Sequence, residues 1–565
     1  MKLTDLKIAQ QATLRPIPEV AAAAGIPADC VEPYGKYKAK ISLDVLERLQ
    51  GAPEGRLIVV TSITPTPFGE GKTVTSIGLA QGLARLGHKV CLTLRQPSMG
   101  PVFGIKGGAA GGGWSQVLPM EELNLHFTGD NHAVAAAHNL LAAMVDASIF
   151  HKNPLKIDPL TVTWRRVMDV NDRTLREIII GLGGRLNGHP RASGFDITAA
   201  SEVMAILALA DGLADLRRRL GRIMVGYNYL GRFVSAEEIR AAGAMCVLLK
   251  EAIKPNLVQT IEGQPCFIHT GPFGNVAHGN SSVVADRMAL KLADYVVTES
   301  GFAADCGFEK FADIKCRQSG LRPSCAVINC TIRALKMHGG KAAVVAGKPL
   351  PEALFEKDCQ ALERGLPNLA HCIGIVRRFG LPMVVSINRF ETDHPEEVAL
   401  LREKALELGA QRVAASFAWA RGGAGCEELA QAVVECCGLP SDLKLLYPDE
   451  LPLREKIYLL ARHIYNAEGA ELAPLVERQL RLFEEQGWSS LPINMAKTSL
   501  SISHNPQWKN LPQGYLFPVT DIRPSIGAGF IYPLAGDMMT MPGLPSRPAA
   551  VDIDIDPSGK TVGLF

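Results

Sequence analysis

Arg56-Leu-Ile-Val-Val-Thr-Ser-Ile-Thr-Pro-Thr-Pro-Phe-Gly-Glu-Gly-Lys-Thr73 is the stretch of this sequence that decides the fold. Leu57 to Val60 form a short, apolar, β-branched run of the kind that makes a buried strand. A loop rich in proline and glycine follows, and from Thr73 to Arg85 the apolar residues recur with the spacing of a helix. Strand, glycine loop, Gly71-Lys72-Thr73 and helix together predict a phosphate-binding loop.

The predicted loop supplies the groups that a nucleotide phosphate needs. Loop N–H groups and the helix N-terminus face the phosphates, Lys72 meets the outer phosphate charge, and the Thr73 hydroxyl ligates Mg²⁺. The usual pattern begins with glycine where this chain has Thr66. An ordinary strand-to-helix turn is the alternative, but it explains the glycines and not a Lys-Thr pair at the helix start. We therefore expect these residues to surround a nucleotide: Thr66, Pro67, Phe68, Gly69, Glu70, Gly71, Lys72 and Thr73.

Length and composition indicate a globular, cytoplasmic protein of several domains. The chain of 565 residues is too long for one hydrophobic core, and its 47% apolar and 21% charged residues are ordinary for a globular protein. A net charge of +2 gives no indication of a nucleic-acid or membrane surface. We expect neither a signal peptide nor a membrane-spanning stretch. The thirteen unpatterned cysteines are typical of reduced thiols in a cytosolic enzyme.

A second strand follows the first helix, from Lys89 to Arg95. Strand, helix and strand within about forty residues form a βαβ unit, which indicates a parallel sheet. Ligands of such sheets bind at the carboxyl ends of the strands, where Arg95 and Gln96 lie. Arg95 is therefore placed to reach the same phosphates as Lys72, although a surface arginine at a strand end is also common.

The rest of the chain alternates between helical and strand-like segments. The glycine-rich stretch from Gly104 to Gly113 is predicted to bring its backbone close to a ligand. Residues 135–260 are rich in helical patterns, including the run from Asp196 to Ala210. The strand-like runs are Met245–Leu249, Cys266–His269, Tyr295–Thr298, Ala326–Ile328 and Met383–Ile387. This alternation predicts an α/β fold: a parallel sheet carrying the phosphate-binding loop, a helical insertion, and a smaller α+β C-terminal domain.

Several motifs in combination resemble those of formate–tetrahydrofolate ligases, and the resemblance runs from Tyr34 to Phe565. The motifs are Thr64-Pro-Thr-Pro-Phe-Gly-Glu-Gly-Lys-Thr73, Arg95-Gln-Pro-Ser-Met-Gly-Pro101, Phe127-Thr-Gly-Asp-Asn-His132, Val258-Gln-Thr-Ile-Glu-Gly263, Gly271-Pro-Phe-Gly-Asn-Val-Ala-His-Gly279 and Met495-Ala-Lys-Thr-Ser-Leu500. Only the phosphate-binding loop would be specific by itself. Since no dehydrogenase or cyclohydrolase segment accompanies these motifs, the chain looks monofunctional.

The resemblance implies an ATP-dependent ligation of formate to tetrahydrofolate, which gives 10-formyltetrahydrofolate, ADP and phosphate through formyl phosphate. Lys72 and Arg95 are then the catalytic residues, because phosphoryl transfer needs positioning and positive charge more than covalent groups. The resemblance also places Phe302, Phe390 and Trp419 at the folate, whose flat pterin ring needs an aromatic slot. Core packing is the alternative for each of these aromatic residues. No general base is assigned, since formate is already ionised at neutral pH.

The domain boundaries follow from the motifs and the change of pattern along the chain. Residues 1–135 with about 280–360 are expected to form the nucleotide-binding domain and 136–280 the insertion. Residues 361–440 are expected on the folate side and 441–565 in the C-terminal domain. The family resemblance implies a homotetramer. Its expected binding partners are the small molecules ATP, formate and tetrahydrofolate, and we expect it to bind neither nucleic acid nor a membrane.

Two further points bear on function. Gln96 stands where many members of the family carry a glutamate linked to a monovalent-cation site, so a requirement for such a cation stays open. A switch ATPase of the chromosome-partition or metal-insertase type is the alternative function, but it would carry a second lysine where this chain has Pro67. An inactive folate-binding relative is a third reading, against which Lys72, Thr73 and Arg95 argue.

Overall fold

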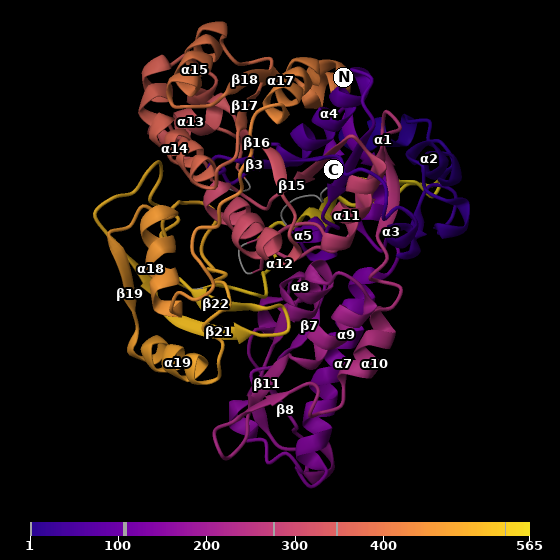
Figure 1. Ribbon diagram of the computed structural model, residues 1–565, viewed down its shortest axis with the longest axis vertical. Helices are drawn as coiled ribbons and strands as arrows, with labels where there is room; N and C mark the ends of the chain where they lie inside the picture. The colour runs from indigo at the N-terminus through magenta and orange to yellow at the C-terminus, as the bar shows by residue number, and fades with distance from the viewer. Residues whose placement is uncertain (1–2, 105–109, 275–276, 346–347, 537, 565) are drawn as a thin grey trace.

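The computed structural model describes residues 3–104, 110–274, 277–345, 348–536 and 538–564. A large mixed sheet runs through its upper half (Figure 1). In spatial order its main strands are β1 (Val31–Pro33), β2 (Ala39–Ile41), β13 (Asn256–Thr260), β14 (Pro265–Ile268), β4 (Val90–Leu94), β15 (Tyr295–Glu299), β3 (Arg56–Ser62), β16 (Pro323–Cys330), β17 (Met383–Asn388) and β18 (Arg412–Ser416). The short strands β5 (Gly111–Gly112) and β6 (Ser115–Leu118) extend it beside β13.

The sheet is parallel where it carries the phosphate-binding loop. Every neighbouring pair from β14 through β18 is parallel, whereas β1, β2 and β13 form an antiparallel edge. Strand β3 lies between β15 and β16, near the middle. The α/β class with a large parallel portion, as predicted, is confirmed. The strands β17 and β18 continue this same sheet, so residues predicted to lie on the folate side share it with the loop.

Helices cover both faces of the sheet. Alternate residues of β3 point to opposite faces, so they pack against different helices. Ile58 and Val60 pack in one apolar cluster with α4 (Lys72–Arg85) and α17 (Glu427–Cys437). Leu57 and Val59 belong to a second cluster with α11 (Val283–Leu292), α13 (Ile332–His338) and α14 (Cys359–Arg378). A continuously apolar strand between two helical layers is what the run from Leu57 to Val60 predicts.

An insertion projects from the sheet at the bottom of Figure 1, and its apolar core also includes Ala528, Phe530 and Tyr532 from further along the chain. Its helices are α7 (Asp130–Phe150), α8 (Glu202–Leu209), α9 (Leu213–Gly221) and α10 (Ala242–Leu249). Its short strands pair as β7 (Arg166–Met168) with β10 (Phe195–Ile197), β8 (Ile178–Ile180) with β9 (Arg191–Ser193), and β11 (Met224–Tyr227) with β12 (Phe233–Ser235). Figure 1 shows these helices and short strands as a body that projects from the sheet.

By length and composition alone, helix α7 could cross a membrane. Its buried residues Val134, Ala137, Leu141 and Val145 are spaced by three or four, which places them on one helical face. They belong to the apolar core that α7 forms with α8 and α10. Such a pattern is typical of a core helix in a globular domain.

The C-terminal part packs against the left side of the sheet domain in Figure 1. It contains α18 (Leu453–His463), α19 (Pro474–Glu485), the pair β19 (Gly469–Leu472) and β20 (Leu516–Val519), and the hairpin of β21 (Asp521–Ser525) and β22 (Phe530–Leu534). Tyr447, Ile457 and Phe517 share one buried cluster with residues of the sheet. The C-terminal part is therefore continuous with the main core.

Apart from α15 (Pro395–Glu407), which packs beside α14, the remaining α-helices and strands are short. They are α1 (Asp5–Gln11), α2 (Ile17–Ala24), α3 (Asp44–Arg48), α5 (Met99–Gly104), α6 (Met120–Asn124), α12 (Arg317–Ser319), α16 (Ala418–Arg421), β23 (Asp554–Ile555) and β24 (Thr561–Val562).

Two local predictions were wrong. Met245–Leu249, predicted as a strand, lies in helix α10, which packs on α7 and α9. A short apolar run does not by itself distinguish a strand from a buried helix, and methionine and leucine are good helix formers. The helix predicted from Asp196 begins only at Glu202, because Ser201 caps it by accepting a hydrogen bond from the Val203 N–H group.

Candidate functional site

The segment predicted to bind phosphate leads directly from β3 into helix α4, so strand, loop and helix follow one another in the predicted order. Gly71 caps α4 with φ +69°, a left-handed conformation that glycine adopts without strain. A Cβ atom at this position would lie 2.7 Å from the Asn388 side-chain nitrogen. Both the conformation and the close approach therefore require glycine, and they place Lys72 and Thr73 in the first turn of the helix.

A cavity of about 540 Å³ lies over this loop. Its walls come from the carboxyl ends of β3, β4 and β15, which is where ligands of parallel sheets bind. The lining residues are Ser62, Pro65, Thr66, Pro67, Phe68, Gly69, Glu70, Gly71, Lys72, Thr73, Val74, Arg95, Gln96, Pro97, Ser98, Pro101, Gly111, Gly271, Phe273, Glu299, Phe302, Ser499 and Leu500. The structure thus brings the whole predicted loop together with Arg95, Gln96 and Phe302.

Glu299, at the end of β15, links the two sides of the cavity and was missed in the sequence. The Thr73 hydroxyl donates a 2.8 Å hydrogen bond to its carboxylate, and the Arg95 guanidinium lies 3.6 Å from the other carboxylate oxygen. The Glu299 side chain is 1% exposed. Its position just after the strand-like run Tyr295–Thr298 is the signal that could have found it, because strand ends face the ligand.

The Thr73–Glu299 pair offers oxygen ligands of the kind that Mg²⁺ prefers. In phosphate-binding-loop enzymes the loop threonine and an acidic residue at a neighbouring strand end hold this ion. Within the residues that the structure describes, no group of three histidine, cysteine, aspartate or glutamate side chains is arranged to hold a metal. The available donors therefore fit an ion bound mainly through nucleotide phosphates and water.

Lys72 is held by a backbone carbonyl on the opposite wall. Its ammonium donates a 3.2 Å hydrogen bond to the carbonyl of Phe302, which also accepts one of 2.7 Å from Ser62. Phe302 has φ +58°, an uncommon conformation for a bulky residue. Burial lowers the pKa of Lys72, and the nearby Glu299 opposes that shift. A bound phosphate would favour the charged ammonium for the same electrostatic reason.

Glu70 stabilises the loop from inside. Its carboxylate accepts a 2.7 Å hydrogen bond from the Thr66 N–H group and another from the Thr331 hydroxyl. Its backbone carbonyl accepts hydrogen bonds from the side-chain amides of Asn329 and Asn388, at 2.7 and 2.9 Å. Burial raises the pKa of this carboxyl group. Glu70 therefore acts on a ligand through the shape of the loop.

Arg95 and Gln96, beside the loop, each have one polar side-chain atom that makes no hydrogen bond with the described residues. The Arg95 guanidinium donates to the carbonyl of Pro272 at 3.3 Å, and the Gln96 N–H group donates to the carbonyl of Thr270 at 2.6 Å. The Arg95 Nε and Gln96 Oε1 atoms are buried without a hydrogen-bond partner among the residues with described positions. Since buried polar atoms are normally paired, this pattern favours a polar ligand at the site.

Phe390 and Trp419, predicted to hold the folate, do not line this cavity. They follow β17 and β18, whose terminal residues Asn388 and Ser416 pair in register at the same edge of the sheet. The Arg333 guanidinium lies 3.4 Å from the centre of the Phe390 ring. Trp419 is 39% exposed, and its indole N–H donates to the Asp5 carboxylate at 3.2 Å. Their role at the folate stays a prediction.

The predicted glycine-rich approach lies partly outside the described residues, because 105–109 are not among them. Gly111, just beyond that stretch, lines the cavity and has φ +86°. A Cβ atom there would lie 2.2 Å from the Ser115 carbonyl oxygen. Glycine is thus required at the part of the segment that the structure places beside the loop.

A second cavity, of about 500 Å³, lies between the insertion and the C-terminal part. His138, Trp164, Glu202 and Tyr532 are among its lining residues. None of the phosphate-binding residues contributes to it. The two cavities are similar in volume, but only the one over the loop is lined by the residues predicted to bind phosphate. We therefore take the loop cavity as the candidate active site.

Comparison with known proteins gives one family across the whole chain. The family model described as formate–tetrahydrofolate ligase matches residues 3–565. The formate–tetrahydrofolate ligase of Desulforamulus reducens is 63% identical, with 100% of this chain and 99% of that protein aligned. The proteins of the same name from Roseiflexus sp. and Cutibacterium acnes are 59% and 52% identical, each with both chains covered over 100% of their length.

Proposed function

Because the chain belongs to the formate–tetrahydrofolate ligase family, we propose that it joins formate to tetrahydrofolate with hydrolysis of ATP. The products are 10-formyltetrahydrofolate, ADP and phosphate, and formyl phosphate is the intermediate. The observation that carries this proposal is the convergence of Lys72, Thr73, Arg95 and Glu299 on one cavity over the loop. No other described cavity combines these groups.

The first step is attack of a formate oxygen on the γ-phosphorus of ATP, with ADP as the leaving group. Lys72 and Arg95 neutralise charge on the transferring phosphoryl group, which is the main demand of this chemistry. Thr73 and Glu299 are the residues that would hold Mg²⁺, which supplies further charge neutralisation when bound. The planar Arg95 guanidinium also suits the carboxylate-like end of formyl phosphate.

The second step is attack of the folate N10 on the formyl carbon, which releases phosphate. Phe302 lines the cavity, and Phe390 and Trp419 follow strands that end at the same edge. This arrangement supports an aromatic site for the pterin beside the phosphate loop. We further propose a cytoplasmic homotetramer, and we leave activation by a monovalent cation to direct test because Gln96 provides a carbonyl oxygen without charge.

The deciding experiment measures ADP release by the purified protein, with formate and tetrahydrofolate each present or omitted. We expect strong ADP formation only with both substrates, in equal amount with 10-formyltetrahydrofolate. In Lys72→Ala the rate should fall by about 100-fold or more, since a charge that stabilises the transferring phosphoryl group is lost. If ADP release did not depend on formate or tetrahydrofolate, the protein would be interpreted as a switch ATPase and not as a ligase. Folate binding without any turnover would indicate an inactive relative.

A further inference from the structure

A buried ion pair joins two distant segments that both contribute to the wall of the candidate active site. The Lys497 ammonium lies 2.6 Å from the Asp305 carboxylate, and the two side chains are 1% and 2% exposed. Asp305 lies three residues after Phe302, in the helical turn Ala304–Phe308. Lys497 directly precedes the segment that carries Ser499 and Leu500, which line the same cavity as Phe302.

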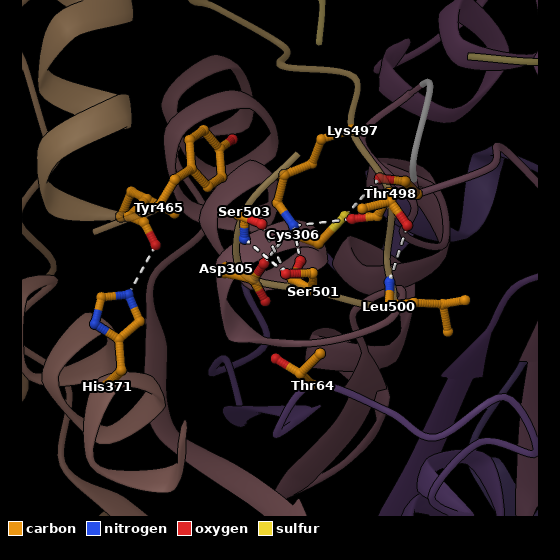
Figure 2. Close-up of polar contacts among 12 residues, drawn as sticks. Thr64, Asp305, Cys306, His371, Tyr465, Lys497, Thr498, Leu500, Ser501 and Ser503 are labelled. Carbon is orange, nitrogen blue, oxygen red and sulfur yellow. Dashed lines mark hydrogen bonds and ion pairs between the residues drawn. The ribbon is translucent and has the colours of Figure 1, made fainter. Parts of the chain in front are cut away.

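The lysine ammonium uses all of its hydrogens in this position. Besides Asp305, it donates to the carbonyls of Thr498 and Ser501, at 2.9 and 2.6 Å (Figure 2). A lysine ammonium has three donors, so each has one acceptor. These bonds fold the chain from Thr498 to Ser501 around the charge. The wall segment is therefore shaped by the same group that attaches it to Asp305.

The segment is fixed on both sides of Lys497. Before it, the Asn494 and Ala496 N–H groups donate to carbonyls of β22, at 2.7 and 2.8 Å. After it, the Ser501 hydroxyl contacts that of Ser503 at 2.9 Å and donates to the Trp508 carbonyl at 2.5 Å. Between these attachments the Leu500 carbonyl accepts a 2.9 Å hydrogen bond from Lys509, while Lys497 holds the carbonyls of Thr498 and Ser501 on either side of it. In Figure 2, Leu500 lies to the right of the contacts between Lys497 and Ser501, and Tyr465 lies to their left.

The opposite half of the pair is connected to the phosphate site through the backbone. The Phe302 carbonyl accepts hydrogen bonds from Lys72 and Ser62, and Phe302 adopts a left-handed conformation two residues before the turn that begins at Ala304. A shift of Asp305 would move this carbonyl and with it the Lys72 ammonium. The ion pair thus connects the C-terminal wall with the catalytic lysine.

We propose that Asp305 and Lys497 are positioning residues, which hold the Ser499–Leu500 wall against the phosphate-binding loop and so set the affinity for the nucleoside triphosphate. This inference rests on the proposed function only in taking ATP as the ligand. Neither side chain lines the cavity, so the pair acts through Phe302 on one side and through Leu500 on the other.

The test compares the dissociation constant of ATP, measured by calorimetric titration without formate or folate, in the wild type and in Asp305→Asn/Lys497→Met. Each single change leaves a buried charge unpaired and should lower the unfolding temperature. The double change removes both charges and should recover most of that temperature, yet weaken ATP binding by about tenfold because the wall is no longer held. An unchanged dissociation constant in the double variant would overturn the proposal.

A matched control separates positioning from general stability. Lys336 and Glu397 form another buried ion pair, at 3.0 Å with exposures of 2% and 0%, and neither lines the cavity. Lys336→Met/Glu397→Gln should leave the ATP dissociation constant unchanged. If ATP binding weakened equally in this control, the effect of Asp305 and Lys497 would come from general stability, and the proposal would be overturned.

A second measurement needs no variant, in case the double variant does not fold. Hydrogen exchange of the peptide covering residues 494–510 is followed in the wild type with and without ATP. We expect slower exchange at 498–501 with ATP, and unchanged exchange there would contradict the proposal. Failure of the wild type to bind ATP at all would instead contradict the proposed function.

Discussion

At the scale of single residues, the proposed chemistry gives Glu299 a role beside that of Lys72. Glu299 lies between the Thr73 hydroxyl and the Arg95 guanidinium and is almost fully buried. Glu299→Gln keeps the shape of the side chain but removes its charge. We expect kcat/KM to fall by about 100-fold and the Mg²⁺ concentration for half-maximal rate to rise, since a carboxylate is the better ligand. Titration of the rate with Mg²⁺ checks this, and Glu299→Asp, which keeps the charge, should recover part of the loss. An unchanged Mg²⁺ dependence in Glu299→Gln would exclude the role.

Trp419 tests the proposed folate position at the same scale. It is 39% exposed and lies outside the cavity over the loop. We expect Trp419→Ala to raise the KM for tetrahydrofolate by about tenfold, because stacking on an aromatic ring contributes roughly 1–3 kcal/mol per base-like ring. The KM for ATP should stay the same. Equal changes in both constants would indicate a structural role for Trp419.

At the scale of elements, the start of helix α4 decides whether the loop can bind phosphate. Gly71→Ala forces a Cβ atom into a left-handed residue and against the Asn388 side chain. We expect a loss of about 1–3 kcal/mol in the free energy of unfolding and a large loss of ATP affinity. Urea unfolding and ATP titration measure the two effects. Gly87→Ala is the matched control, since Gly87 has φ +89° and open space around its Cβ position. It should lose stability and keep ATP affinity.

At the scale of the whole molecule, Glu202 joins the insertion to the C-terminal part. Its carboxylate accepts hydrogen bonds from the Gly527 and Ala528 N–H groups, at 2.9 and 3.2 Å. Burial raises its pKa to about 7. A folded-state pKa above the unfolded one means that the folded state binds the proton more tightly, so this contribution to stability is lost as pH rises from about 4.5 to about 7. The loss is at most about 3 kcal/mol above pH 7.

Glu202→Gln should therefore unfold at a higher temperature than the wild type at pH 8, with the difference vanishing as the pH falls below about 4.5. Glutamine keeps an oxygen acceptor for the two N–H groups but carries no charge at any pH. Thermal unfolding of both proteins across this pH range checks the prediction. Glu471→Gln, at an exposed position of β19, should show no such pH-dependent gain. A constant difference at all pH values would assign the effect to packing.

The sequence by itself determined the local parts of the site. The apolar run from Leu57, the glycines and the Lys72-Thr73 pair specify strand, loop and helix start, because strand, turn and helix preferences act over a few residues. Arg95, at the end of the next strand, lines the same cavity as Lys72, while its contact with phosphate stays a prediction. Met245–Leu249 was predicted wrongly because a short apolar run fits either a strand or a buried helix, and packing against α7 and α9 decided between them.

Only the tertiary structure decided which distant residues meet at this loop. Sheet order places β15 next to β3, and this brings Glu299 to Thr73. The C-terminal fold brings Leu500 to the same cavity, and Lys497, three residues before it, pairs with Asp305. Such contacts arise from burial of apolar surface between elements, which depends on the whole chain and leaves no periodic signal in the local sequence.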